Sequence, residues 1–186
     1  MHIFTLTTFS MKAFTSILFT SVILAIMIFS SCRTIPKGAS VYKPFDKNKY
    51  LGKWYEIARF DFRFERNLNN TTAEYSLNSD GTIRVVNRGY NYLTKQWKEA
   101  VGKAKFTGNP SEAKLKVSFF GPFYGAYNVI ALDDNYQYSL VCGKNLDYLW
   151  ILSREKTIPD EVKSKFLNTA REIGFDISKL IWVEHN

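Results

Sequence analysis

Eight short runs of alternating apolar and polar residues follow one another along the chain, and they constrain the fold more than any other feature. Turn signals such as Asn78–Gly81 and Gly121-Pro122 separate them. Consecutive strands at this spacing predict an all-β, antiparallel, up-and-down barrel of eight strands, which has no exposed edges and can hold one small ligand. An open sandwich is the alternative, but it needs long crossovers, which the spacing does not provide. The runs span residues 54–61, 72–77, 82–91, 96–106, 112–120, 124–132, 136–143 and 147–153.

One C-terminal α-helix is predicted after the eighth run. Thr157 is the expected N-cap, Pro159 lies in the first turn, and Gly174 follows the last turn. A segment over residues 177–184 then predicts a last short strand. The apolar residues of the helix fall on one stripe, so the helix should lie on the outer wall of the barrel. They are Val162, Phe166, Ala170 and Ile173.

The first 32 residues predict a lipoprotein signal peptide. Lys12 precedes an apolar stretch, Phe14–Phe29, which ends in Ser30-Ser31-Cys32. This ending resembles a bacterial lipobox, in which the signal is cleaved before a cysteine that becomes lipid-modified, so Cys32 is the expected lipidation site. A plain transmembrane anchor is the alternative, because the apolar run is long enough to span a bilayer. Translation can start at Met1 or Met11. Residues 33–44 then predict a polar tether, and residues 45–186 predict the folded domain.

Basic residues predict which face of the strands is outside. The formal net charge is +8, and Lys103/Lys105 and Lys114/Lys116 occupy alternating strand positions. This spacing indicates a solvated outer face. No DNA- or RNA-binding motif accompanies it, so no nucleic acid partner is expected. A mild attraction to anionic membrane surfaces is compatible with the charge.

The same alternation predicts an apolar barrel interior with a few polar groups. Alanine and glycine leave room there, and the combination suits a fatty acyl chain with one polar end. The alternative is a filled barrel whose side chains simply pack. For Tyr138–Cys142 the register is open, because either set of alternate residues can face inward. The predicted ligand-binding residues are Glu56, Ala58, Tyr75, Val85, Asn87, Gly102, Ala104, Phe106, Leu115, Val117, Phe119, Tyr127, Val129, Tyr148 and Trp150.

Catalytic and metal-binding patterns give little reason to expect an enzyme or a cofactor. Cys142 has no partner for an intramolecular disulfide once Cys32 is lipidated, and a small buried thiol is the expected role. A nucleophilic thiol inside the barrel is the alternative, and it would need a base or a cation nearby. His185 is the only histidine left after the leader is removed, so neither His-assisted catalysis nor a Cys/His metal cluster is evident.

Three separated landmarks resemble the signature regions of the lipocalins. They are Gly52-x-Trp54, Asp133 with Tyr136 in a turn, and Arg154 at the end of the last barrel strand. Leu132-Asp133-Asp134 stands where the family usually has Thr-Asp-Tyr. Arg154 is also the residue expected to stack on Trp54 where the barrel closes.

Longer strings resemble the bacterial outer-membrane lipocalins in particular. They include FDKNKYLGKWYEIARFDFRFERN, LKVSFFGPFYGAYNVIALD and YLWILSR, and the resemblance covers about residues 44–183. It implies a lipid-anchored protein of the outer membrane that faces the periplasm and binds fatty acids or lysophospholipids. Retention at the inner membrane and a homodimer are left open. A structural envelope protein with a filled barrel is the remaining alternative.

Overall fold

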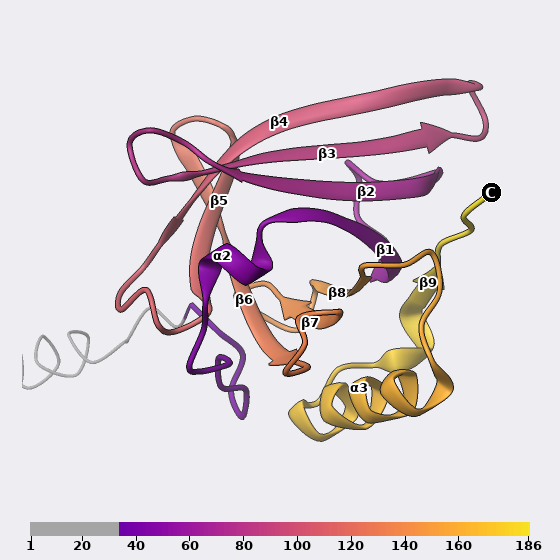
Figure 1. The fold of residues 1–186 in the computed structure, drawn as a ribbon. Coiled ribbons are helices and arrows are strands. Elements are labelled where there is room, and N and C mark those ends of the chain that lie inside the picture. The colour runs from indigo at the N-terminus through magenta and orange to yellow at the C-terminus, as the bar shows by residue number, and fades with distance from the viewer. Residues whose placement is uncertain (1–33) are drawn as a thin grey trace, which may run out of the picture. The chain divides into compact units, whose positions relative to one another are not determined.

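The computed structural model describes residues 34–186 and shows a closed β-barrel with one C-terminal helix (Figure 1). Each strand pairs antiparallel with the next, and β1 pairs with β8 as well as β2, which closes the barrel. The predicted eight-stranded antiparallel barrel is therefore confirmed. The strands are β1 (Gly52–Phe60), β2 (Leu68–Leu77), β3 (Ile83–Asn91), β4 (Gln96–Phe106), β5 (Lys114–Phe120), β6 (Phe123–Leu132), β7 (Tyr138–Cys142) and β8 (Leu149–Ser153).

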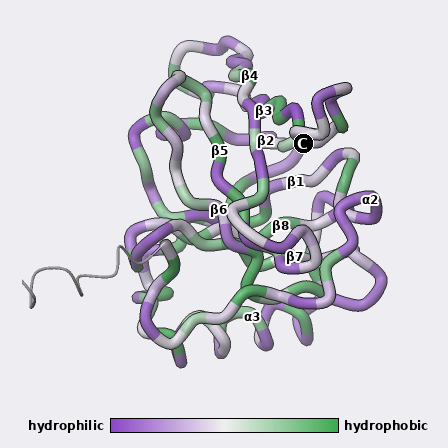
Figure 2. The backbone as a smooth tube through the Cα atoms, turned by 90° about the vertical axis from the view of Figure 1, so that its left-hand side faces the viewer, coloured by the Kyte–Doolittle hydropathy of each residue, from purple (hydrophilic) through white to green (hydrophobic). Residues whose placement is uncertain are grey.

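Side chains alternate between the two sides of the barrel wall, as expected from the sequence, and polar and apolar colours alternate along several strands in Figure 2. The inward side chains form one buried cluster, which includes Trp54, Val85 and Leu115. The outward side chains of β1, β7 and β8 form a second cluster beneath the C-terminal helix. The barrel wall thus separates an inner core from an outer core.

Strand β1 contains a bulge that the sequence does not predict. Glu56 pairs with Leu152 and Ala58 pairs with Ile151, so Ile57 is an extra residue on β1. The bulge reverses the alternation beyond it: Arg59 points inward, and Ala58 joins the outer cluster. The prediction that Ala58 lines the ligand site is therefore wrong, because strict alternation does not survive the extra residue.

Helix α3 (Asp160–Ile173) covers the outer core. Phe166 and Ala170 are buried, and Val162 and Ile173 pack against the same cluster, as the stripe predicted. The helix ends at Gly174, which has a left-handed φ of 106°. The expected N-cap at Thr157 is wrong: Pro159 occupies that position with extended backbone and no side-chain cap.

The chain after α3 completes the seam of the barrel. A 3₁₀ turn, η1 (Ile177–Lys179), leads into β9 (Leu180–Trp182), which pairs with the second half of β1. The first half of the same β1 edge pairs with β2. Strand β9 therefore takes over this edge of β1 where β2 leaves it.

One end of the barrel is plugged by the segment that precedes β1. The short helix α2 (Lys47–Tyr50) follows Phe45, and both Phe45 and Tyr50 are buried in the inner core. The main chain of Tyr42 accepts from Ala113 (3.0 Å) and donates to Val129 (2.8 Å). Residues 34–44, predicted as part of a tether, thus lie against the barrel within one compact unit, Thr34–Asn186.

The leader and Cys32 lie outside the described residues. Within residues 34–186, no helix is long and apolar enough to cross a membrane.

Candidate ligand-binding cavity

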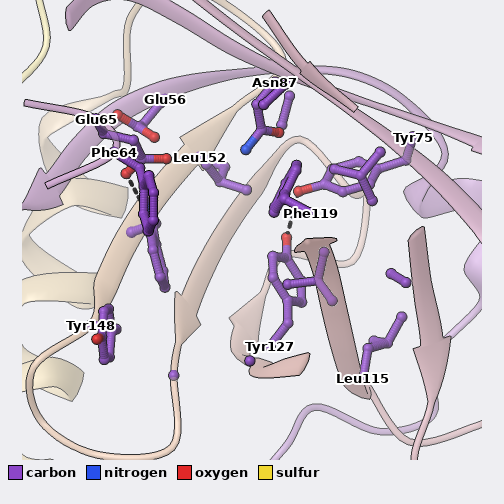
Figure 3. A pocket seen from close by; sticks show the side chains of 18 of the residues that line it. Glu56, Phe64, Glu65, Tyr75, Asn87, Leu115, Phe119, Tyr127, Tyr148 and Leu152 are labelled. Carbon is purple, nitrogen blue, oxygen red and sulfur yellow. Dashed lines mark hydrogen bonds between the residues drawn. The ribbon is translucent and has the colours of Figure 1, made fainter. Parts of the chain in front are cut away.

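The barrel encloses a cavity of about 590 Å³ whose walls are mostly apolar (Figure 3). Its wall comes from β1 to β6, β8 and the β1–β2 loop, so residues far apart in sequence meet there. Most of the predicted ligand-binding residues line it. They are Glu56, Tyr75, Val85, Asn87, Ala104, Leu115, Val117, Phe119, Tyr127, Tyr148 and Trp150.

Four predicted ligand-binding residues do not line the cavity. Ala58 faces the helix because of the β1 bulge. Gly102 is covered by Phe119, since a Cβ built on Gly102 would lie 2.8 Å from the Phe119 ring. Phe106 and Val129 belong to the inner core near the plugged end, where Phe45 packs 6.1 Å from Phe106 between ring centroids. The plug therefore shortens the cavity relative to an open barrel.

Three tyrosine hydroxyls form a hydrogen-bonded cluster in the deeper part of the cavity. Tyr127 lies 2.8 Å from Tyr50 and 2.9 Å from Tyr75, and Tyr50 also reaches Ser139 at 3.1 Å. Burial raises the pKa of Tyr50 to about 12 and raises the pKa values of Tyr75 and Tyr127 as well. These phenols therefore stay neutral and satisfy one another.

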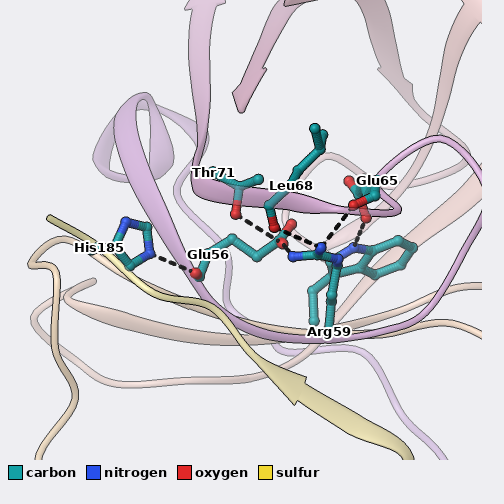
Figure 4. A network of polar contacts seen from close by, with 7 residues as sticks. Glu56, Arg59, Glu65, Leu68, Thr71 and His185 are labelled. Atoms are coloured by element: carbon teal, nitrogen blue, oxygen red, sulfur yellow. Dashed lines mark hydrogen bonds and ion pairs between the residues drawn. The ribbon is translucent and has the colours of Figure 1, made fainter. Parts of the chain in front are cut away.

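A buried ion pair forms part of the cavity wall (Figure 4). Arg59 Nη1 donates to Glu56 Oε1 at 2.7 Å, and Thr71 Oγ1 donates to the same oxygen at 3.0 Å. The second terminal nitrogen of Arg59 donates to the carbonyls of Glu65 (2.7 Å) and Leu68 (2.9 Å). Arg59 thus holds the β1–β2 loop against the barrel. Its guanidinium is paired with the Glu56 carboxylate and hydrogen-bonded to two main-chain carbonyls.

A second carboxyl, Glu65, faces the same network from the β1–β2 loop. Its Oε2 accepts from the indole nitrogen of Trp150 at 3.0 Å. Burial raises the pKa of Glu65 to about 8, with a further contribution from the nearby Glu56 carboxyl. Burial also raises the pKa of Glu56, against the stabilising charge of Arg59. Only Glu56 pairs directly with the Arg59 guanidinium, so burial and the neighbouring Glu56 carboxyl favour the protonated form of Glu65.

Several of these residues are absent from the sequence-based prediction. Strict alternation would place Arg59 on the opposite face from Glu56, and only the bulge brings the two together. Glu65 lies in a loop, for which strand alternation gives no direction. His185 also joins the region, because its Nε2 donates to the main-chain carbonyl of Glu56 at 2.8 Å. The one sequence signal for this network is the spacing of an acidic and a basic residue, Glu56 and Arg59, three positions apart.

The signature residues meet at the plugged end. The Arg154 guanidinium lies 3.9 Å from the centroid of the fully buried Trp54 ring. Arg154 also donates to the carbonyls of Lys49, Leu51, Lys53 and Tyr136 at 2.7–3.2 Å. Gly52 adopts a φ of 93° beside it, and Asp133 caps the turn that presents Tyr136 by accepting from the main chain of Asn135, Gln137 and Tyr138. One side chain therefore closes the barrel floor by joining three segments.

Cys142 lies away from the cavity. The β7 register places Val141 and Ser139 inward and places Cys142 in the outer cluster under α3. Burial raises the pKa of the Cys142 thiol to about 12, which is the opposite of what a nucleophile needs. Within residues 34–186, no group of three or more His, Cys, Asp or Glu side chains is placed to hold a metal ion.

A family model described as a lipocalin-like domain matches residues 45–185. The chain is a lipocalin. It is 58% identical to the outer membrane lipoprotein Blc of Citrobacter freundii over 159 residues, which covers 86% of this chain and 90% of that protein. The Blc protein of Vibrio cholerae is 47% identical, over 87% of this chain and 95% of its own.

More distant lipocalins share the fold. Apolipoprotein D of Cavia porcellus is 33% identical, with 82% of this chain and 81% of that protein covered. Among solved structures, insecticyanin from Manduca sexta superposes with a TM-score of 0.67 at 22% identity, covering 83% of this chain and 88% of that one. At that identity the likeness concerns the barrel alone.

Proposed function

We propose that this lipocalin is anchored in the outer membrane, faces the periplasm, and binds or carries fatty acids or lysophospholipids inside its barrel. The observation that carries the proposal is the cavity of about 590 Å³, with mostly apolar walls and a few polar side chains. A lipocalin-type role in binding or transport also accords with the family.

The mostly apolar lining favours a lipid tail over a polar ligand. Val85, Ala104, Leu115 and Val117 offer apolar contact for a tail. Burying about ten methylenes could yield several kcal/mol at ~0.8 kcal/mol each, before the costs of association and ordering. We expect micromolar affinity from a binding free energy of this size.

Polar groups at one side of the cavity could orient the head group. Glu65 borders the cavity, and the Oδ1 of Asn87 is buried without a hydrogen-bond partner among residues 34–186. Both can accept hydrogen bonds from a ligand hydroxyl or ammonium. Catalysis is not part of the proposal, because Cys142 lies outside the cavity.

The direct test is to extract lipid from the purified full-length protein and identify it by mass spectrometry. We expect stoichiometric fatty acid or lysophospholipid from protein purified without added lipid. Protein that carries no lipid and takes up none from solution would instead favour a filled or structural barrel.

The proposed anchor is tested at Cys32. The Blc relatives are named outer membrane lipoproteins, and the residues that end at Cys32 resemble a lipobox. Cys32→Ala should release the protein from the membrane fraction, because the acyl chains supply about 0.8 kcal/mol per buried CH₂. A variant whose leader has been removed but which still sediments with membranes would contradict lipidation at this site.

A further inference from the structure

Four exposed aromatic side chains lie together at the mouth of the cavity. We call Phe64, Phe120, Phe123 and Tyr124 the entrance patch; their exposed fractions are 50%, 62%, 78% and 39%. Phe64 packs on Phe120 with ring centroids 5.6 Å apart, and Phe120 pairs with Phe123 across the β5–β6 hairpin. All four also line the cavity. Contiguous exposed aromatics of this kind mark an interaction surface.

The entrance patch is flanked by cations. The Arg63 guanidinium lies 4.4 Å from the Phe64 ring centroid. The ammonium groups of Lys105 and Lys116 lie 5.2 and 5.1 Å from the Tyr124 ring. None of the ion pairs within residues 34–186 includes these three cations. Aromatic rings flanked by free cations match the boundary between acyl chains and anionic head groups.

The start of the described chain lies on the barrel wall beside the middle of β6. Asn128 Nδ2 donates to the carbonyl of Thr34 (2.9 Å) and to that of Gly143 (3.1 Å), and Gly143 lines the cavity. Cys32 precedes Thr34 by two residues, and two extended residues span about 7 Å. An anchor at Cys32 therefore keeps the barrel within reach of the lipid surface, and the entrance patch is what selects the end that faces it.

We propose that the entrance patch docks on a phospholipid surface that contains anionic lipids, so that the cavity opens directly into the membrane. The proposal rests on the proposed anchor at Cys32, and it adds the orientation of the barrel relative to the membrane. Phe123, on the β5–β6 hairpin, enters the head-group region, and Arg63, Lys105 and Lys116 contact the phosphates. Ligand then passes between membrane and cavity without crossing water.

The test uses the full-length lipidated protein in vesicles of phosphatidylethanolamine and phosphatidylglycerol. An environment-sensitive dye is placed on Phe123→Cys and, as matched control, on Leu77→Cys. Leu77 is 48% exposed at the opposite end of the barrel, and the native Cys142 is buried. We expect the dye at position 123 to shift to the blue and to be quenched by brominated acyl chains, and the dye at 77 to stay in water.

Three results would overturn the proposal, and they differ in meaning. Protein that floats with the vesicles while both dyes stay in water contradicts docking alone. A dye at position 123 that is shielded in detergent, together with cross-linking between copies of the unlabelled Phe123→Cys protein, assigns the entrance patch to a homodimer. Protein that does not float contradicts the anchor, while lipid extraction tests the barrel ligand separately.

A second measurement follows lipid transfer from vesicles into the cavity. Phe120→Ser with Phe123→Ser should slow transfer by about tenfold or more and weaken its dependence on anionic lipid and salt. Leu77→Ser should match wild type in both respects. Equal rates and equal salt dependence in all three proteins would contradict membrane docking.

Discussion

Trp54 and Arg154 show how two side chains can close one end of a barrel. The indole is fully buried, its nitrogen donates to the carbonyl of Tyr50 at 2.8 Å, and the guanidinium covers its face. The guanidinium in turn binds carbonyls from two separate segments, residues 49–53 and the turn at Tyr136. Losing the ring would leave both a cavity and a desolvated cation.

Trp54→Ala should therefore lower the free energy of unfolding by about 3–5 kcal/mol, the usual cost of truncating a large buried aromatic. Trp182→Ala is the matched control, because Trp182 is 42% exposed and its contact with Lys163 lies at the surface. That control should cost about 1 kcal/mol or less. Denaturant titration measures both, and equal unfolding free energies for the two variants would remove the closing role of Trp54.

At this scale the sequence predicted contacts between distant residues better than contacts between neighbours. The Trp54–Arg154 pair follows from residue type and from the lipocalin resemblance. The Glu56–Arg59 pair, only three residues apart, was assigned to opposite faces. The difference is physical: a bulge at Ile57 changes local direction without leaving a mark in residue type.

The β1–β2 loop is the element whose behaviour depends most on protonation. Glu65 holds it to the wall through Trp150, and its pKa is raised to about 8. The folded state therefore binds more protons than the unfolded state, in which Glu titrates near 4.3. This contribution to stability is present below the unfolded pKa and is lost as the pH rises towards 8.

Between about pH 5 and pH 8, wild type should lose stability relative to Glu65→Gln by about 1–2 kcal/mol. Partial solvent exposure of the Glu65 side chain keeps this loss small. Above pH 8 the difference should level off. Glu155→Gln, an exposed exchange of the same kind, should follow wild type. Parallel stability curves for wild type and Glu65→Gln across this range would contradict the raised pKa of Glu65.

Elements with regular patterns were predicted well, and irregular ones were not. The stripe on α3 follows from helical spacing, so its packing on the outer wall could be predicted from the sequence. Further irregularities interrupt β2 between Asn69 and Thr72, β5 between Val117 and Phe120, and β6 between Val129 and Ala131. Helix α2 spans only four residues, too few for an apolar period to be read.

At the scale of the whole molecule, the barrel wall separates two tasks. The outer core between β1, β7, β8 and α3 is solid and holds Cys142. The inner core is filled at the plugged end by Phe45, Tyr50 and Trp54, and it opens into the cavity towards the β1–β2 loop. The fold class could be predicted because every strand contributes to one repeated pattern. The depth of the cavity could not, because it depends on a plug formed by residues before β1.

The central claim is that a lipid occupies the barrel interior, and a tryptophan at Ala104 tests it most directly. Ala104 lines the cavity, is 4% exposed, and pairs with Ile83 and Val117 across β4. An indole there should fill the space that a tail needs. Lys103→Trp is the matched control, because Lys103 lies one position away on the outer face, in an exposed ion pair with Asp80.

The measurement is a titration of each folded protein with a fluorescent long-chain fatty acid, followed through the ligand's own emission. The account predicts micromolar binding to wild type and to Lys103→Trp, and a loss of affinity of at least about tenfold for Ala104→Trp. Circular dichroism confirms that each variant keeps its fold. Equal affinity in wild type and a folded Ala104→Trp variant would contradict an internal lipid site.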